Sequence, residues 1–124
     1  CIRDSNYDMF SVDDASSMLL NAGLPSRIMI DASHANSRKI PARQLDVARD
    51  IARQVSRGSH SIFGMMIESN IEEGRQDVVA GQPLTYGQSI TDPCINWTDS
   101  SALLQDLAAA VRLRRGGQES AGVE

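Results

Sequence analysis

The stretch that decides the fold is Ile28-Met29-Ile30-Asp31-Ala32-Ser33-His34-Ala35-Asn36-Ser37. An apolar run passes into small polar residues around His34, one of only two histidines in the chain. A buried parallel strand has this form where it ends at the rim of a functional site, because the strand itself is apolar and the residues after it carry the chemistry. The pattern predicts a strand over about 27–33, with His34 just beyond its carboxyl end.

A second apolar run covers about 61–67 and ends in the carboxylate of Glu68. It is almost continuously apolar, which is typical of a strand covered on both faces. Between the two runs lies a helical pattern that begins near Pro41 and ends at Gly58. Two strands joined by a helix predict a right-handed βαβ unit with neighbouring parallel strands. We therefore expect His34 and Glu68 at the same edge of the sheet.

Two further helices and a long loop complete the expected order of elements. The first helix is expected to be capped by Ser11, with Asp14 as its capping-box partner, and to stop at Gly23. Residues 69–98 show no periodicity, and a loop of this length is usually functional. The last helix is expected from about Asp99 or Ser100 to Gly116, ending on cations suited to the helix dipole. The apolar stripes expected to be buried are Val12, Ala15, Met18, Leu19 and Ala22, then Leu45, Ala48, Ile51, Ala52 and Val55, then Leu103, Leu104, Leu107, Ala108 and Val111.

This order indicates an α/β fold, but two strands are too few for a stable parallel sheet. We therefore expect the 124 residues to be a segment of a larger fold whose other strands lie upstream. Residues 1–5 have no pattern that links them to the rest, and are expected to be a cloning scar or a truncated loop. The fold itself is assigned to 6–116, and 117–124 are expected to form a disordered tail.

Composition excludes several classes of partner. A net charge of −4, from 12 Lys+Arg and 16 Asp+Glu, leaves no basic footprint for nucleic acid. No apolar stretch approaches the roughly 20 residues of a membrane span. The two cysteines, Cys1 and Cys94, do not form a disulfide framework, which favours a cytoplasmic location.

The candidate functional residues are His34, Glu68 and Asp92, the last from the long loop. An imidazole and carboxylates suit a divalent first-row metal ion such as Mn²⁺, Fe²⁺, Co²⁺ or Zn²⁺. From spacing alone other interpretations stay open, because His34 can be a structural polar residue and Glu68 can pair with an arginine.

Several separated motifs resemble the C-terminal part of class I DAHP (3-deoxy-D-arabino-heptulosonate-7-phosphate) synthases. They are Ser33-His34-Ala35-Asn36-Ser37 with Lys39, Met66-Ile67-Glu68-Ser69, Glu73-Gly74, residues 81–92, Cys94-Ile95 with Trp97, and the closing Arg-Leu-Arg-Arg-Gly. The likeness runs from about Asn6 to Gly116. It implies a (β/α)8 TIM barrel, of which this chain would be the last helix of unit six plus units seven and eight.

The resemblance also implies an activity and a site. The family condenses phosphoenolpyruvate with erythrose 4-phosphate, the entry to the shikimate pathway and aromatic amino acid biosynthesis. Its single divalent metal ion is held by a Cys from an early strand and by a His, a Glu and an Asp, which fall on His34, Glu68 and Asp92. His34 and Asp92 are the implied catalytic residues, which handle protons or position water. The parent enzyme is expected to be a cytoplasmic homo-oligomer, a dimer or tetramer.

Some residues should not be given roles that belong upstream. The implied Cys ligand and the Arg and Lys residues that bind the substrate phosphates are absent here, so Cys94, Arg38 and Lys39 are not their substitutes. Asn36, Ser37 and Lys39 either shape the site or only fix the loop. Pro93 stands where the family often has Ala, which biases Asp92 towards an extended backbone.

Two alternatives remain at this point. One is a related synthase of the KDO 8-phosphate type, against which the loop motif over 81–92 argues. The other is a non-catalytic α/β interaction segment, in which the three candidate ligands would not converge. We also expect the isolated 124 residues to be inactive and only marginally folded, since one ligand and much of the sheet are missing.

Overall fold

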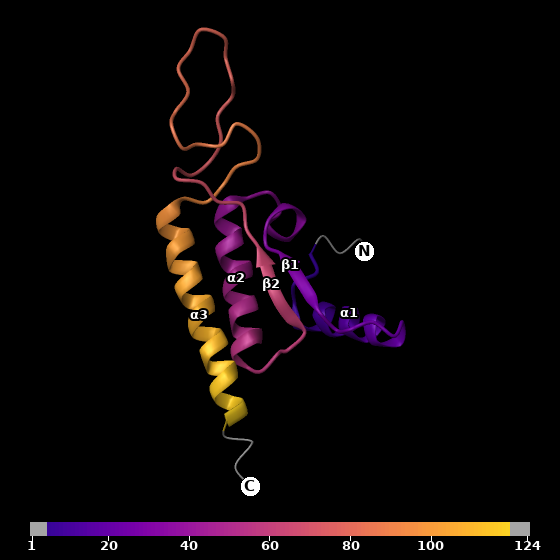
Figure 1. Cartoon of the computed structure of the whole chain (residues 1–124). Helices are drawn as coiled ribbons and strands as arrows, with labels where there is room; N and C mark the ends of the chain where they lie inside the picture. The colour runs from indigo at the N-terminus through magenta and orange to yellow at the C-terminus, as the bar shows by residue number, and fades with distance from the viewer. Residues whose placement is uncertain (1–4, 120–124) are drawn as a thin grey trace.

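A computed structural model describes residues 5–119 of the chain. The elements follow the predicted order: α1 (Met9–Asn21), β1 (Ile28–Asp31), a short 3-10 helix η1 (His34–Ser37), α2 (Pro41–Ser56), β2 (Ile62–Met66) and α3 (Trp97–Glu119). Both strands are shorter than the ranges expected from the sequence. Figure 1 shows α2 and α3 as long, roughly parallel rods beside the sheet, with the segment between β2 and α3 projecting above them.

The two strands form a parallel pair, as the βαβ pattern predicts. Ile28 pairs with Ile62 and Asp31 with Met66, with one irregularity between Ile28 and Met29. Because the strands are parallel, the residues after both of them emerge at the same edge of the sheet. The sequence therefore predicted correctly where the chain after each strand would lie.

The main core lies between this sheet and the two long helices. Val47, Ile51 and Val55 of α2 pack with Ile30 and Ile62 of the strands, and Ala110 of α3 joins the same cluster. A second cluster links Ala48, Ile95 and Leu103. The spacing of the buried α2 residues is that of an amphipathic helix lying on a sheet. Two of them are polar, Gln44 and Gln54, which the apolar stripe predicted for this helix did not include.

Several helix boundaries and buried positions differ from expectation. Asp8, not Ser11, caps α1: its extended backbone precedes the helix, and its carboxylate accepts from the Ser11 backbone N–H at 3.2 Å. Of the five residues in the predicted α1 stripe only Val12 is buried, and Met18 is 72% exposed, because α1 contacts little besides the sheet. In α3, Leu104 is also exposed.

The last helix is longer than predicted at both ends. It begins at Trp97 and continues through Gly117 to Glu119, so its last turn holds no basic residue. Residues 120–124, the rest of the predicted tail, and residues 1–4 of the predicted scar lie outside the described part. Arg114 is not a dipole partner at the helix end: its guanidinium donates to the carbonyls of Ser59, at 2.9 Å, and Ile62, at 3.3 Å. This arginine ties α3 to the start of β2.

One face of the sheet is covered and the other is not. Met29 and Phe63 are more than half exposed, and Met66 is also exposed. The prediction that both faces are covered is therefore not met within 5–119. No helix in this part of the chain is long and apolar enough to cross a membrane.

Candidate metal centre at the carboxyl edge of the sheet

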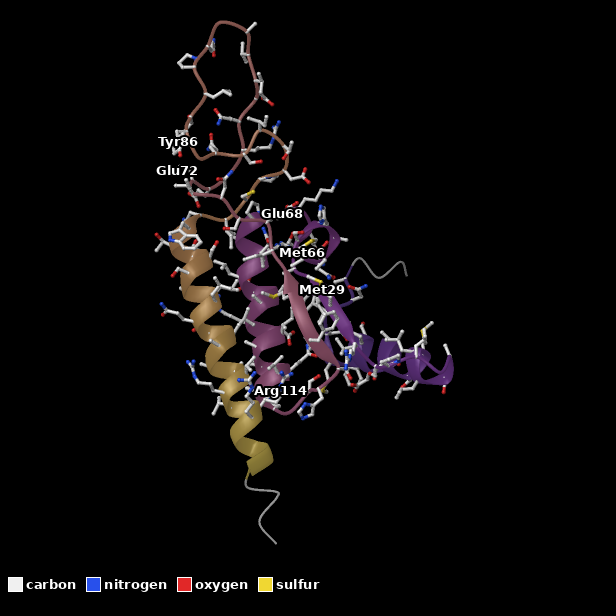
Figure 2. All side chains as sticks on the ribbon, viewed as in Figure 1. Met29, Met66, Glu68, Glu72, Tyr86 and Arg114 are labelled. Carbon is white, nitrogen blue, oxygen red and sulfur yellow. The ribbon has the colours of Figure 1, made fainter. Side chains whose placement is uncertain are left out.

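The predicted ligands converge at the edge where both strands end. Nε2 of His34 lies 3.3 Å from Oε1 of Glu68 and 3.6 Å from Oδ2 of Asp92. One donor atom from each of the three residues lies within 4.8 Å of the others. Figure 2 shows Glu68 at the upper end of β2, just beyond Met66 and on the side of the molecule opposite to Arg114. The alternative that predicted divergent side chains does not fit this geometry.

His34 is positioned by a compact local network. The chain turns sharply after β1, and the backbone of His34 adopts φ 50°, which non-glycine residues rarely do. Its Nδ1 lies 2.8 Å from Oδ2 of Asp31 and 2.8 Å from the hydroxyl of Ser33. Asn36 donates to the backbone carbonyl of Asp31 at 2.7 Å and bonds to Asn6, so Asn36 fixes the loop.

These contacts shift the protonation of both partners. The hydrogen bond to Asp31, followed by the charges of Asp31 and Glu68, raises the pKa of His34 above 6.5. Burial works to raise the pKa of Asp31, but the hydrogen bonds from Ser33 and His34 outweigh it and the pKa is lowered. The lowered pKa keeps Asp31 ionised, and the raised pKa makes the His34 imidazole easier to protonate.

Glu68 is positioned through its backbone. Its N–H donates to Oε1 of Gln44 at 2.8 Å, and its carbonyl accepts from Nε2 of the same side chain at 3.2 Å. Gln44 is only 1% exposed, so this two-ended clamp is shielded from water. Burial raises the pKa of Glu68, and the nearby His34 opposes that shift. The ion-pair partner of Glu68 in the described residues is His34 rather than an arginine.

Asp92 reaches the site from the loop between β2 and α3. This loop is irregular but well connected: bridges join Ser69 with Ile95, Gly74 with Cys94, and Arg75 with Ser89. Inside it, the side-chain amide of Gln76 bonds to the backbone of Thr85 in both directions, at 2.7 Å each. The Asp92 side chain is 65% exposed, the most exposed of the three ligands.

The three candidate ligands line a small pocket of about 100 Å³. Its other lining residues are Ser37, Lys39, Pro41, Gln44 and Pro93. Cys94 lies outside this group: it is buried and its thiol contacts the carbonyl of Asp92, while burial raises its pKa. This agrees with the expectation that Cys94 is a packing residue. A larger groove of about 480 Å³ between α2 and α3 brings together no comparable donor set.

The donor set fits a divalent cation. Two carboxylates beside an imidazole supply one nitrogen and two oxygen ligands, which first-row divalent ions accept. The two acidic groups raise the energy of each other's ionised form, and a bound cation relieves that repulsion. Three protein ligands also leave coordination positions for water, substrate or a further ligand.

Sequence reasoning missed two residues that hold this site. Asp31 carries a usable signal, since it is a charged residue in the last position of an apolar strand. Gln44 carries none, because a glutamine in the first turns of a helix is expected to face solvent. Its burial depends on α2 docking over the end of β2.

Comparisons with known proteins show which family the chain belongs to. Residues 2–105 match the model of the DAHP synthetase I family. The Phe-sensitive phospho-2-dehydro-3-deoxyheptonate aldolase of Escherichia coli K12 is 47% identical over 114 residues, which cover 92% of this chain and 33% of the relative. The Trp-sensitive phospho-2-dehydro-3-deoxyheptonate aldolase of Salmonella typhi is 49% identical over 112 residues, 90% of this chain and 32% of the relative.

A solved structure gives the same result. The phospho-2-dehydro-3-deoxyheptonate aldolase of Francisella tularensis SCHU S4 superposes with a TM-score of 0.83 at 43% identity, over 88% of this chain and 31% of that one. The chain thus spans about one third of the length of the curated relatives it matches. It belongs to the DAHP synthetase I family.

Proposed function

We propose that the chain is part of an enzyme that condenses phosphoenolpyruvate with erythrose 4-phosphate and water to give DAHP and phosphate. In that enzyme it forms the last helix of unit six and units seven and eight of a (β/α)8 barrel. The exposed sheet face around Met29 and Phe63 supports this, because in a barrel that face is covered by the other strands. Family membership favours this substrate pair over the KDO 8-phosphate type of reaction.

The observation that carries the proposal is the convergence of His34, Glu68 and Asp92 at the carboxyl edge of the sheet. Active sites of α/β barrels lie at this edge. The three residues hold one divalent ion, of the Mn²⁺, Fe²⁺, Co²⁺ or Zn²⁺ type, with a further ligand from elsewhere in the protein. When bound, the ion supplies Lewis-acid polarisation of the erythrose 4-phosphate aldehyde.

The chain's own residues have separate tasks in this reaction. C3 of phosphoenolpyruvate attacks the aldehyde carbon, water adds to C2, and phosphate leaves. Asp92 is more exposed than Glu68 and lines the pocket, so its carboxylate can take a proton from the incoming water. His34 would bind the ion through Nε2, so the proton that Asp92 removes from the water is the one passed on to the developing alkoxide oxygen. Glu68, fixed by Gln44, stays a ligand.

The test compares two histidine substitutions in the complete protein. His34→Ala should abolish divalent-ion-dependent formation of DAHP, because it removes the central ligand. His60→Ala is the matched control: residue 60 precedes β2 at the opposite end of the strand, and activity should be retained. Full activity in His34→Ala refutes the site. Turnover of arabinose 5-phosphate in preference to erythrose 4-phosphate refutes the substrate assignment.

A further inference from the structure

We propose that Asp31 is a positioning residue, which keeps a hydrogen on Nδ1 of His34 and so leaves Nε2 free to bind the cation. This inference rests on the proposed metal site and adds a residue outside its ligand set. Asp31 does not line the pocket with the three ligands, and its role is exerted through the imidazole ring. Carboxylates that hold a metal-binding histidine in this way are a recurring arrangement.

The contacts of the two Asp31 oxygens carry the argument. Oδ1 accepts from the backbone N–H of Ser33 at 2.8 Å and from the Ser33 hydroxyl. Oδ2 faces Nδ1 of His34 at 2.8 Å. An ionised carboxylate only accepts hydrogen bonds, so Nδ1 must be the donor. The neutral ring then has its lone pair on Nε2, the atom that faces Glu68 and Asp92.

From the same contacts we expect Asp31→Asn to change which nitrogen of His34 carries the hydrogen. The backbone N–H of Ser33 is a fixed donor, so the amide oxygen of the new side chain must occupy the Oδ1 position. Its NH₂ group then faces Nδ1 of His34 and donates to it. The ring hydrogen moves to Nε2, where it blocks the ligand atom. The substitution that best preserves shape should therefore be the most damaging, which a merely structural role for Asp31 does not predict.

The experiment measures Mn²⁺ affinity of the complete protein by titration calorimetry for three Asp31 variants and two reference variants. Asp31→Ala should weaken binding about 10- to 100-fold, and Asp31→Asn at least as much. Asp31→Glu keeps an acceptor-only group and should retain more affinity than either. Asp46→Asn, an exposed helical carboxylate that pairs with Arg49, is the control for loss of one charge and should bind normally. Ser33→Ala should have a small effect, since the Asp31–His34 pair remains.

A second readout does not depend on the metal. Nitrogen-15 NMR of the metal-free protein, at a pH where the ring is neutral, should place the hydrogen of His34 on Nδ1 in the unsubstituted protein and on Nε2 in Asp31→Asn. The proposal is overturned if the hydrogen stays on Nδ1 in Asp31→Asn, or if that variant binds Mn²⁺ more tightly than Asp31→Glu.

Failure of this inference can be told apart from failure of the proposed function. If His34→Ala leaves Mn²⁺ affinity unchanged, His34 is not a ligand and the metal site itself is refuted. If His34→Ala removes binding while Asp31→Asn leaves it intact, the metal site stands and only the role of Asp31 is lost.

Discussion

His34 and Glu68 follow corresponding ends of two neighbouring parallel strands, but the protein holds them in different ways. The imidazole of His34 is held directly, by hydrogen bonds with side chains within three positions along the chain. Within residues 5–119, no hydrogen bond joins the Glu68 side chain to its neighbours in sequence, and the Glu68 backbone is instead clamped by Gln44 from α2. The first arrangement fixes the direction of a ring, whereas the second fixes the position of a residue.

This difference separates local from tertiary control. The direction of the His34 ring depends on the turn that follows β1, where Asp31 and Ser33 are part of the same short segment. The position of Glu68 depends on α2 packing over β2, since Gln44 is buried only when the helix is docked. Substitutions should therefore affect the two ligands independently.

The largest effect that would test this separation is expected for Gln44→Met. It keeps the volume of the side chain but removes both hydrogen bonds to Glu68, leaving a shielded N–H without its acceptor. Such an unsatisfied group costs about 1–3 kcal/mol. Hydrogen exchange at the Glu68 amide of the complete protein should accelerate by about tenfold or more, and Mn²⁺ affinity should fall. The tautomer of His34 should not change.

Gln54→Met is the matched control for that variant. Gln54 is also a buried glutamine of α2, but its amide donates to the carbonyl of Tyr7 and to the Asp50 carboxylate, not to Glu68. Gln54→Met should remove the contact with Tyr7 and leave Mn²⁺ affinity unchanged. Unchanged exchange at the Glu68 amide in Gln44→Met would show that the clamp does not hold the strand end.

The sequence could predict which candidate ligands come together but not the residues that hold them in place. Two apolar runs that end in His34 and Glu68 are enough to place both at one edge of a parallel sheet, since strand direction follows from the connection. Asp92 could be named as a candidate from its loop, but only the family resemblance put it beside the other two, because the loop has no periodicity and is held by amide contacts such as those of Gln76. Gln44 was not predictable, since burial of a polar group is decided by its tertiary partner.

The misplaced helix features have two different physical origins. Ser11 is a good capping residue by type, but Asp8 precedes the helix with the extended backbone that a cap requires. Met18 fits a helical apolar stripe, yet it is exposed because periodicity shows which face is apolar and not whether a partner covers it. Periodicity located the helices, but it did not identify the capping residue or show which apolar side chains a partner covers.

A smaller effect on Mn²⁺ binding is expected from a substitution in the loop that carries Asp92, Gly87→Ala. Gly87 has φ 77°, and a Cβ there would lie 2.8 Å from Cβ of Ile71. Gly87→Ala should displace the segment that carries Asp92, making the loop more open to limited proteolysis and weakening Mn²⁺ binding. The loss should be smaller than in Gln44→Met, because His34 and Glu68 stay in place.

Gly81→Ala provides the comparison that isolates this collision. Gly81 lies in the same loop with φ 81°, but a Cβ there would meet nothing within 4 Å. Both substitutions carry a left-handed backbone penalty of roughly 1–2 kcal/mol. Only Gly87→Ala adds the contact with Ile71, so it should be cleaved faster and bind Mn²⁺ more weakly. Equal behaviour of the two variants would show that the loop is not anchored at Ile71.

The smallest expected effect is on the pH titration of His34. It distinguishes the side-chain contacts that hold His34 from the backbone contacts that hold Glu68. In the metal-free protein the His34 imidazole should titrate above pH 6.5, since its pKa is raised first by the Asp31 hydrogen bond. A pKa raised on folding means that the charged ring stabilises the native state below pH 6.5, and that this contribution is lost as pH rises through the native pKa.

Asp31→Ala should move the NMR titration midpoint of His34 down towards 6.5, although Glu68 and Asp92 still favour the charged ring. Gln44→Met should lower the midpoint less than Asp31→Ala does, because the Glu68 charge contributes less to the raised pKa of His34 than Asp31 does. If Gln44→Met moved the midpoint as far as Asp31→Ala, the two ligands would be coupled and the separation between them would be wrong.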